Sequence, residues 1–231
     1  MEAKAGPLRN RTINVMDQEF IDWAISMLGG NVAVTEEPHG DQSMVYILAT
    51  PKENFFLKIA PGLAKERERL EWLNGKLPVP KVIGFTHIED KIAILMTAIE
   101  GVDLAKLKKI WPADKIINKL AEVLREFHAT DIKDYPFGSP GPDKILVHGD
   151  ACLPNFIFKD DKFSGYIDLG DARLDLPEAD LSAAVWSLQY NLGPGYGLRF
   201  LKKYGVQNAT EEMVEKLKLQ YEEMQKEWGL H

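Results

Sequence analysis

The chain has 231 residues, of which 45% are hydrophobic and 27% are charged, proportions ordinary for a soluble globular protein. The formal net charge of −7 disfavours nucleic acid and anionic membrane surfaces as main partners, and is compatible with a cationic small molecule. The single cysteine, Cys152, excludes an intramolecular disulfide and a cysteine-rich zinc site. This length allows one large domain or two small lobes that share a cleft.

The sequence also bears on the compartment. Residues 1–15 contain no apolar segment of signal-peptide length, and no apolar run reaches the roughly 18 residues of a membrane span. We therefore expect a cytoplasmic protein with no membrane partner.

The first third of the chain predicts a helix followed by short strands. Residues 17–30 carry apolar side chains at helical spacing and end on two glycines. The runs at 31–37, 43–50 and 54–60 are apolar or alternating and are separated by turn residues, which predicts an antiparallel meander. A charged helix over 63–77 and two further strands, 79–85 and 91–101, complete a β-rich N-terminal lobe predicted to span residues 1–98.

The rest of the chain has a helical pattern. Residues 112–130 place apolar side chains on one stripe, and a Pro/Gly-rich connector follows at 134–144. Short strands are predicted at 145–150 and within 156–168, and two or three helices between 176 and 228, the last capped by Asn208 or Thr210. Residues 99–231 are therefore predicted to form a mostly α-helical C-terminal lobe.

The segment "VHGDACLPNFIF", residues 147–158, contains the residues best suited to catalysis. In a phosphoryl transferase, an Asp accepts or orients the proton of the attacking hydroxyl, and an Asn at the other end of the same loop ligates a metal ion. Asp150 and Asn155 have this arrangement, and Asp168 follows a strand and precedes a Leu-Gly turn. Because Mg²⁺ favours oxygen ligands, Asn155 and Asp168 are candidate metal ligands. Turn and cap chemistry is the alternative for all three.

The nucleotide side of such a site requires a cation. Lys58 lies within the apolar strand pattern "FFLKIA", where burying a lysine is costly unless it is paired. A phosphate and a carboxylate from the following helix would pair it, and Glu66, Glu68 and Glu71 are available. An edge-strand lysine that extends to solvent is the alternative. The order Lys, Glu, His-x-Asp-x-x-x-x-Asn and Asp-x-Gly is that of kinases.

Three further residues have expected roles that are structural. His148 is predicted to brace the loop by hydrogen bonding, without carrying a proton, and Cys152 to be a small, unreactive loop residue. Asp180 lies at the start of a predicted helix, where it is expected to cap the helix or interact with its dipole.

Several segments together resemble the aminoglycoside phosphotransferases, in particular the aminoglycoside 3'-phosphotransferase (kanamycin/neomycin kinase) group. "VHGDACLPN" and "GYIDLGD" resemble the catalytic and metal loops of that family. "ERLEWLNGKLPVPKVIGF", "ILMTAIEG" and "LREFHATDIKDYPF" resemble three of its other segments. The resemblance covers residues from about 40 to 181, which is most of the chain.

The resemblance implies an α+β, protein-kinase-like two-lobed fold that binds ATP or GTP with Mg²⁺. It implies that Asp150 is the catalytic base and that Asn155 and Asp168 are the metal ligands. On the nucleotide side it implies Lys58 as the phosphate-binding residue, Glu66 as its ion-pair partner and Phe56 as the ring that stacks on the base, although Phe56 could equally be a core residue. It also implies a hinge and a phosphate loop, formed by Thr97, Ala98 and Ile99 and by the segment "HGDQSMVY" with Ser43.

The resemblance further implies phosphoryl transfer to a hydroxyl of an aminoglycoside, and hence antibiotic resistance, by a monomer or weak dimer. Asp171, Asp175 and Glu178 are candidate contacts for a cationic acceptor. However, only about twenty residues separate His128 from His148, where the family has a long helical insert that builds much of the acceptor pocket. A kinase for another small hydroxylated metabolite or antibiotic, and a catalytically silent nucleotide-binding module, therefore remain alternatives.

Overall fold

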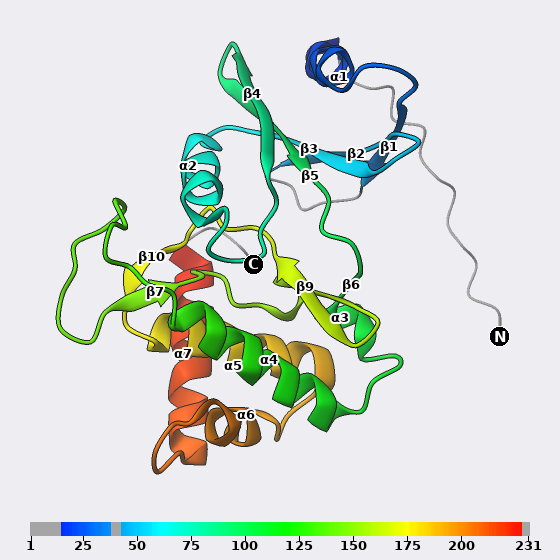
Figure 1. The fold of residues 1–231 in the computed structure, drawn as a ribbon. Coiled ribbons are helices and arrows are strands. Elements are labelled where there is room, and N and C mark those ends of the chain that lie inside the picture. The colour runs from blue at the N-terminus through cyan, green and yellow to red at the C-terminus, as the bar shows by residue number, and fades with distance from the viewer. Residues whose placement is uncertain (1–14, 38–42, 228–231) are drawn as a thin grey trace. The chain divides into compact units, whose positions relative to one another are not determined.

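The computed structural model of the chain describes residues 15–37 and 43–227 (Figure 1). Its contacts divide it into two compact units. The first consists of residues up to 63 together with 83–96, and the second consists of residues 64–82 together with those from 97 onward. The helix over residues 64–73 thus groups with the second unit. The functional division into lobes 1–98 and 99–231 stays a prediction.

The first unit contains a five-stranded sheet with the strand order β1-β2-β3-β5-β4. The first three strands pair antiparallel in chain order, as the predicted meander requires. In space, β5 lies between β3 and β4. The strands are β1 (Ala33–Glu37), β2 (Met44–Ala49), β3 (Asn54–Ala60), β4 (Val82–Ile88) and β5 (Lys91–Thr97).

Helix α1 (Val15–Leu28) and the sheet form the core of this unit. Phe20 and Ile21 of α1 are buried in one cluster with Leu57 of β3. Each large apolar side chain that is fully buried stabilises the fold by about 1.5–3 kcal/mol. Because side chains alternate along a strand, Phe56 and Lys58 lie on the opposite face of β3 from Leu57, and both are only partly buried.

The second unit is mostly helical. It contains two small sheets, β6-β8-β9 and β10-β7, in which neighbouring strands pair antiparallel. Its helices are α2 (Ala64–Leu73), α3 (Leu104–Leu107), α4 (Ala113–His128), α5 (Glu178–Leu192), α6 (Gly197–Tyr204) and α7 (Glu211–Glu227). Its strands are β6 (Val102–Asp103), β7 (Ile145–Val147), β8 (Phe156–Lys159), β9 (Lys162–Tyr166) and β10 (Arg173–Asp175), and a short 3₁₀ helix, η1, covers Leu153–Asn155.

The long helices of this unit lie where the apolar periodicity predicts them. Helix α4 buries one continuous stripe, including Ile116, Leu120, Leu124 and Phe127. Helix α7 begins after Thr210, whose hydroxyl accepts the backbone N–H of Met213, so Thr210 is the cap. The strand β6 and the helix α3, of two and four residues, are too short to produce a periodic pattern, and the sequence does not predict them.

Among the described residues, no helix is both long enough and apolar enough to cross a bilayer.

Candidate active site

The central element of the site is the loop of residues 148–155, which connects β7 to β8 and is hereafter named the catalytic loop. The side-chain amide of Asn155 donates hydrogen bonds to both the backbone oxygen and the Oδ2 of Asp150, each at 2.9 Å. The hydroxyl of Tyr221, from α7, lies 2.8 Å from the other carboxylate oxygen, Oδ1. The Asp150 side chain is thus held from two directions, by its own loop and by a helix 71 residues further along the chain.

The amide of Asn155 is oriented in a way that suits a metal ligand. Its Nδ2 donates to Asp150, and within the described residues no hydrogen bond engages its Oδ1. The side chain is 7% exposed, and Pro154 in the same turn of η1 fixes the backbone beside it. An amide oxygen so placed is a hard ligand of the kind that Mg²⁺ prefers.

The second candidate ligand, Asp168, follows a residue that is hydrogen-bonded to the catalytic loop. The backbone N–H of Ile167 donates to the carbonyl of Asn155 at 3.1 Å, and the carbonyl of Ile167 accepts from His148 Nε2 at 3.1 Å. Asp168 itself adopts a left-handed backbone with φ of 60°, a conformation that Asp tolerates better than most residues. The carboxylate of Asp168 and the amide oxygen of Asn155 therefore fit Mg²⁺. The described part of the chain contains no group of three or more His, Cys, Asp or Glu residues that could hold a metal ion, and this pair of ligands does not require one.

His148 braces the loop as the sequence predicts. Because the Ile167 carbonyl can only accept, Nε2 of His148 carries the proton. Nδ1 therefore accepts the backbone N–H of Asp150, at 3.3 Å. The neutral imidazole thus connects the residue before Asp168 to Asp150 itself.

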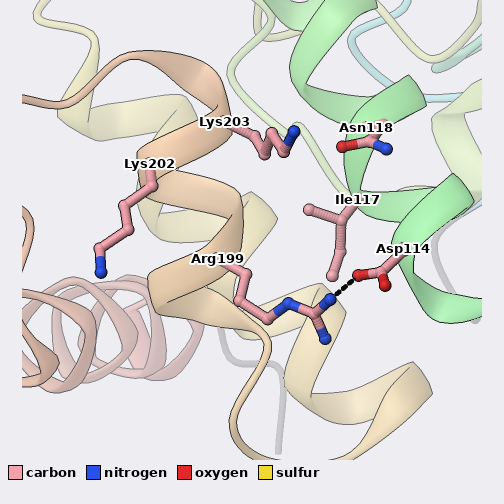
Figure 2. Close-up of a pocket in the computed structure, with 6 residues that line it drawn as sticks. All are labelled: Asp114, Ile117, Asn118, Arg199, Lys202 and Lys203. Carbon is pink, nitrogen blue, oxygen red and sulfur yellow. Dashed lines mark hydrogen bonds and ion pairs between the residues drawn. The ribbon is translucent and has the colours of Figure 1, made fainter.

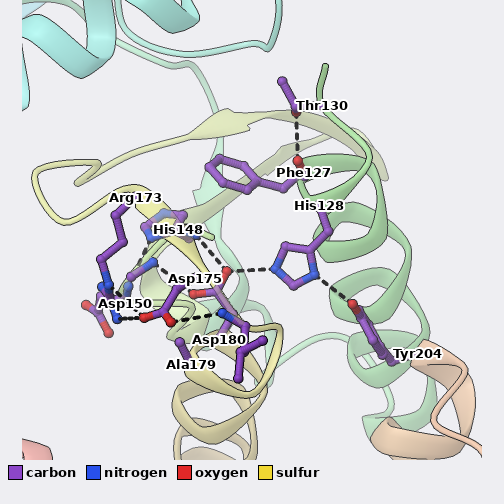
Figure 3. Close-up of polar contacts among 12 residues, drawn as sticks. Phe127, His128, Thr130, His148, Asp150, Arg173, Asp175, Ala179, Asp180 and Tyr204 are labelled. Carbon is purple, nitrogen blue, oxygen red and sulfur yellow. Dashed lines mark hydrogen bonds and ion pairs between the residues drawn. The ribbon is translucent and has the colours of Figure 1, made fainter. Parts of the chain in front are cut away.

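Asp180 lies in the first turn of α5, as predicted, but its side chain anchors the catalytic loop and does not cap the helix. Its carboxylate is completely buried and accepts the backbone N–H groups of His148, at 2.7 Å, and Gly149, at 2.8 Å. It also accepts from His128 Nε2 at 2.8 Å, and His128 Nδ1 lies 2.7 Å from the Tyr204 hydroxyl (Figure 3). A buried carboxylate requires such donors.

The electrostatics of this anchor favour its charged form. Burial alone would raise the pKa of Asp180, but the hydrogen bond and charge of His128 and the backbone N–H of His148 hold that pKa below its ordinary value. Burial also raises the pKa of Tyr204, so its hydroxyl stays protonated beside His128 Nδ1.

Of the predicted nucleotide-side residues, Glu66 has the clearest environment. It is 4% exposed in the first turn of α2, whereas Glu71 is exposed and pairs with Arg67. A Cβ placed on Gly170 would lie 3.6 Å from the Cβ of Glu66, so Glu66 lies beside the Asp168-Leu169-Gly170 turn. Lys58 belongs to the first unit, and its predicted pairing with Glu66 stays a prediction.

The hinge and the phosphate loop are described in part. The N–H of Thr97 donates to the carbonyl of Lys81, and the Thr97 hydroxyl accepts from the N–H of Lys81. Ala98 and Ile99 follow, each partly buried. Ser43 is partly buried, and residues 38–42 of the predicted phosphate loop lie outside the described residues.

The candidate acceptor contacts lie in residues 171–178, hereafter named the acidic segment. A Cβ on Gly149 would lie 2.8 Å from the Asp171 Cβ, so Asp171 packs beside the catalytic loop. Asp175 binds Arg173 at 3.0 Å and accepts the N–H of Leu176, so its carboxylate already has partners. Asp171 and Glu178 are exposed.

A separate surface cavity of about 570 Å³ lies between α4 and α6, and Figure 2 shows an ion pair between Asp114 and Arg199 at its edge. Its lining residues are Asp114, Ile117, Asn118, Arg199, Lys202 and Lys203. None of the predicted site residues lines this cavity, so it is distinct from the candidate active site.

Solved structures of aminoglycoside phosphotransferases superimpose on this chain. The aminoglycoside-3'-phosphotransferase of type VIII superimposes with a TM-score of 0.67 at 22% identity, covering 87% of this chain and 97% of that one. Streptomyces rimosus APH(3'')-Id, in complex with ADP and streptomycin, superimposes with a TM-score of 0.68 at 19% identity, covering 87% and 96%. The chain thus has the predicted α+β, protein-kinase-like fold.

Sequence comparison identifies the family. The model of the phosphotransferase enzyme family matches residues 34–143 and 139–215. An aminoglycoside 3'-phosphotransferase of Niallia circulans is 32% identical over 209 aligned positions, covering 69% of this chain and 79% of the relative, and one of Streptomyces ribosidificus is 27% identical over 233 positions, covering 74% and 88%. The chain therefore belongs to the phosphotransferase enzyme family, in the group of the aminoglycoside phosphotransferases, as its motifs predicted.

The same alignments show that this chain is internally shorter than its relatives. The alignment with the S. ribosidificus enzyme has 233 positions, more than the 231 residues of this chain, yet it covers only 74% of the chain. Many positions of the relative therefore have no counterpart in this chain. The two matches to the family model meet at residues 139–143, within the short connector that precedes β7.

Proposed function

We propose that this chain transfers the γ-phosphoryl group of ATP to a hydroxyl group of an aminoglycoside, and thereby inactivates the antibiotic. The arrangement of Asp150, Asn155 and Ile167 in one hydrogen-bonded unit is the observation that carries the proposal. The relatives are named as aminoglycoside 3'-phosphotransferases, and the S. rimosus neighbour was solved with ADP and an aminoglycoside. Both support this assignment.

In the proposed reaction, Asp150 orients the acceptor hydroxyl and accepts its proton as the oxygen attacks the γ-phosphorus. Asn155 and Tyr221 hold the carboxylate, so little reorganisation is needed when the hydroxyl arrives. The oxygen–phosphorus bond to the acceptor forms as the bond to ADP breaks. Lys58 would contact the phosphates and Glu66 would orient Lys58.

Mg²⁺ would be held by Asn155 Oδ1 and the carboxylate of Asp168, and when bound it would neutralise charge on the phosphate oxygens. The Asp168→Asn variant keeps a side chain that tolerates the left-handed backbone but removes the ligand charge. We expect it to raise the Mg²⁺ concentration needed for half-maximal activity. An unchanged requirement would contradict the metal assignment.

The decisive experiment measures ADP release with kanamycin, neomycin and a panel of other hydroxylated metabolites, each with Mg²⁺ and either ATP or GTP. We expect turnover of at least one aminoglycoside, confirmed by ³¹P NMR of the product, and loss of turnover in Asp150→Asn. If only a panel member that is not an aminoglycoside were turned over, the proposed acceptor would be wrong and the proposed phosphoryl transfer would stand. Tight nucleotide binding without transfer to any acceptor would favour the catalytically silent alternative.

The second candidate function, a kinase for a different small hydroxylated molecule, has specific support. Many positions of the S. ribosidificus relative have no counterpart in this chain, and the two partial family matches meet at residues 139–143, in the short connector. With so short a connector, acceptor contacts would come mainly from other elements, such as the exposed Asp171 and Glu178. An acceptor smaller than a multi-ring aminoglycoside would need fewer contacts with the protein.

A further inference from the structure

Helix α7 contributes a side chain to the catalytic carboxylate, and no sequence motif indicates it. Tyr221 is 4% exposed, and its hydroxyl donates to Asp150 Oδ1 at 2.8 Å. Asn155 donates to the other oxygen, Oδ2. The two donors act on opposite oxygens of one carboxylate, so together they define the plane in which it lies.

The direction of each proton in this cluster follows from chemistry. The Tyr221 oxygen lies 3.3 Å from the sulfur of Cys152 as well as 2.8 Å from Asp150. An ionised carboxylate only accepts, so the single hydroxyl proton of Tyr221 points to Asp150. The Cys152 thiol has two acceptors within reach, the Tyr221 oxygen at 3.3 Å and the carbonyl oxygen of Ala183 at 3.9 Å, and the nearer contact links Cys152 through Tyr221 to Asp150.

Both donors keep their protons. Burial raises the pKa of Tyr221, and the neighbouring Cys152 and Asp150 raise it further. Burial likewise raises the pKa of the Cys152 thiol, with Asp150 adding to the effect. Both groups therefore stay protonated at neutral pH, and the Tyr221 hydroxyl remains a donor to Asp150.

We propose that Tyr221 is a positioning residue for phosphoryl transfer: its hydroxyl, with the Asn155 amide, holds the Asp150 carboxylate in the orientation that receives the acceptor's proton. This rests on the proposed role of Asp150. Each carboxylate oxygen can accept two hydrogen bonds, so Tyr221 leaves a lone pair of Oδ1 for the acceptor hydroxyl. A freely rotating carboxylate would be correctly oriented for only part of the time, which would lower the rate of the chemical step and leave substrate binding unchanged.

The structure supplies a variant that isolates the hydroxyl. The ring of Tyr221 packs against Trp186, with ring centroids 5.3 Å apart, and Tyr221→Phe retains this contact. Tyr190→Phe is the matched control, because Tyr190 is 75% exposed on α5 and stacks on the same Trp186. Cys152→Ala removes the thiol beside the Tyr221 oxygen and keeps the phenol, so we expect it to lower the single-turnover rate less than Tyr221→Phe does.

The test compares single-turnover phosphotransfer, KM values and thermal unfolding among the three variants and the wild-type chain. We expect Tyr221→Phe to lower the single-turnover rate about tenfold, the size of effect expected from losing a hydrogen bond to a charged group, with KM for MgATP and acceptor within about twofold of wild type. A rate equal to that of Tyr190→Phe would overturn the proposal. So would a proportional rise in KM, which would place the hydroxyl in substrate binding.

An activity-independent measurement separates this proposal from the proposed function. The hydrogen-bonded hydroxyl proton of Tyr221 is expected as a downfield ¹H resonance that disappears in Tyr221→Phe and in Asp150→Ala, but not in Tyr190→Phe. If the wild-type chain phosphorylates nothing, the proposed function fails, and this resonance alone decides whether Tyr221 holds Asp150; its absence overturns the contact. Mass spectrometry after incubation with MgATP provides a last check, because a phosphate found on Tyr221 would make the phenol an acceptor and overturn its positioning role.

Discussion

The catalytic loop and the acidic segment lie next to each other in the second unit but are built differently. Side chains and backbone groups of the catalytic loop are bound by residues from distant helices, including Asp180 and Tyr221. In the acidic segment, Asp171 and Glu178 are exposed, and the contacts of Asp175 are made within the segment itself. The difference indicates that the proposed catalytic residues are fixed by buried contacts, whereas the proposed acceptor contacts include surface residues that can change at little structural cost.

The largest effect should come from Asp150→Asn, because it removes the proposed base. General base catalysis contributes about 10²–10⁴-fold, so we expect kcat to fall by that factor in the ADP-release assay while the fold is retained. Asp161→Asn, in an exposed turn, is the control and should behave as wild type. If kcat fell less than tenfold in Asp150→Asn, Asp150 would not be the general base, and the hydrogen bonds that hold the catalytic loop would have another role.

Removing the anchor should come next. Asp180→Ala leaves three buried donors without their acceptor, and we expect the free energy of unfolding to fall by about 3–5 kcal/mol, measured by urea denaturation. Its contribution also depends on pH. Because the folded-state pKa of Asp180 is lowered, its stabilisation is complete above the ordinary value of 3.8 and is lost as the pH falls through the lower folded-state pKa. The stability difference between wild type and Asp180→Ala should therefore shrink in acid; a difference independent of pH would contradict the charged state.

A glycine pair tests the steric part of the comparison. Gly149 has φ of 89°, and an added Cβ would lie 2.4 Å from the carbonyl oxygen of Asp171; Gly193 has φ of 94° and open space around the same atom. Both Ala variants should lose about 1 kcal/mol of stability from backbone strain. Only Gly149→Ala should lose more, together with activity, since it forces the catalytic loop away from the acidic segment. Equal losses in thermal unfolding and activity would contradict this close contact.

The smallest effects should come from the acidic segment. Asp171→Asn and Glu178→Gln each remove one exposed charge, so we expect KM for a cationic acceptor to rise a few-fold with kcat unchanged. The increase should diminish as salt is added, because exposed charges are screened. An uncharged acceptor provides the control, and an equal rise in its KM would rule out charge recognition.

The sequence predicted those parts of the site that are local in the chain. Asp150 and Asn155 belong to one loop, and the brace by His148 could be expected from the same segment. Asp180 and Tyr221 contact the loop from 31 and 71 residues away, and helical periodicity does not specify such pairings. One signal for Asp180 was present: it lies in the apolar run "ADLSAAVWSL", and a carboxylate in such a run requires buried donors.

The two backbone hydrogen bonds of Ile167 have a consequence for how the enzyme can diversify. They join the Asp168 turn to the catalytic loop through main-chain atoms of residue 167, which any amino acid except proline supplies in full. The spacing between the proposed base and the proposed metal ligand is therefore insensitive to the identity of that side chain. A lineage could thus accumulate substitutions around this junction, and remodel the neighbouring surface for new acceptors, while its chemical step stays the same.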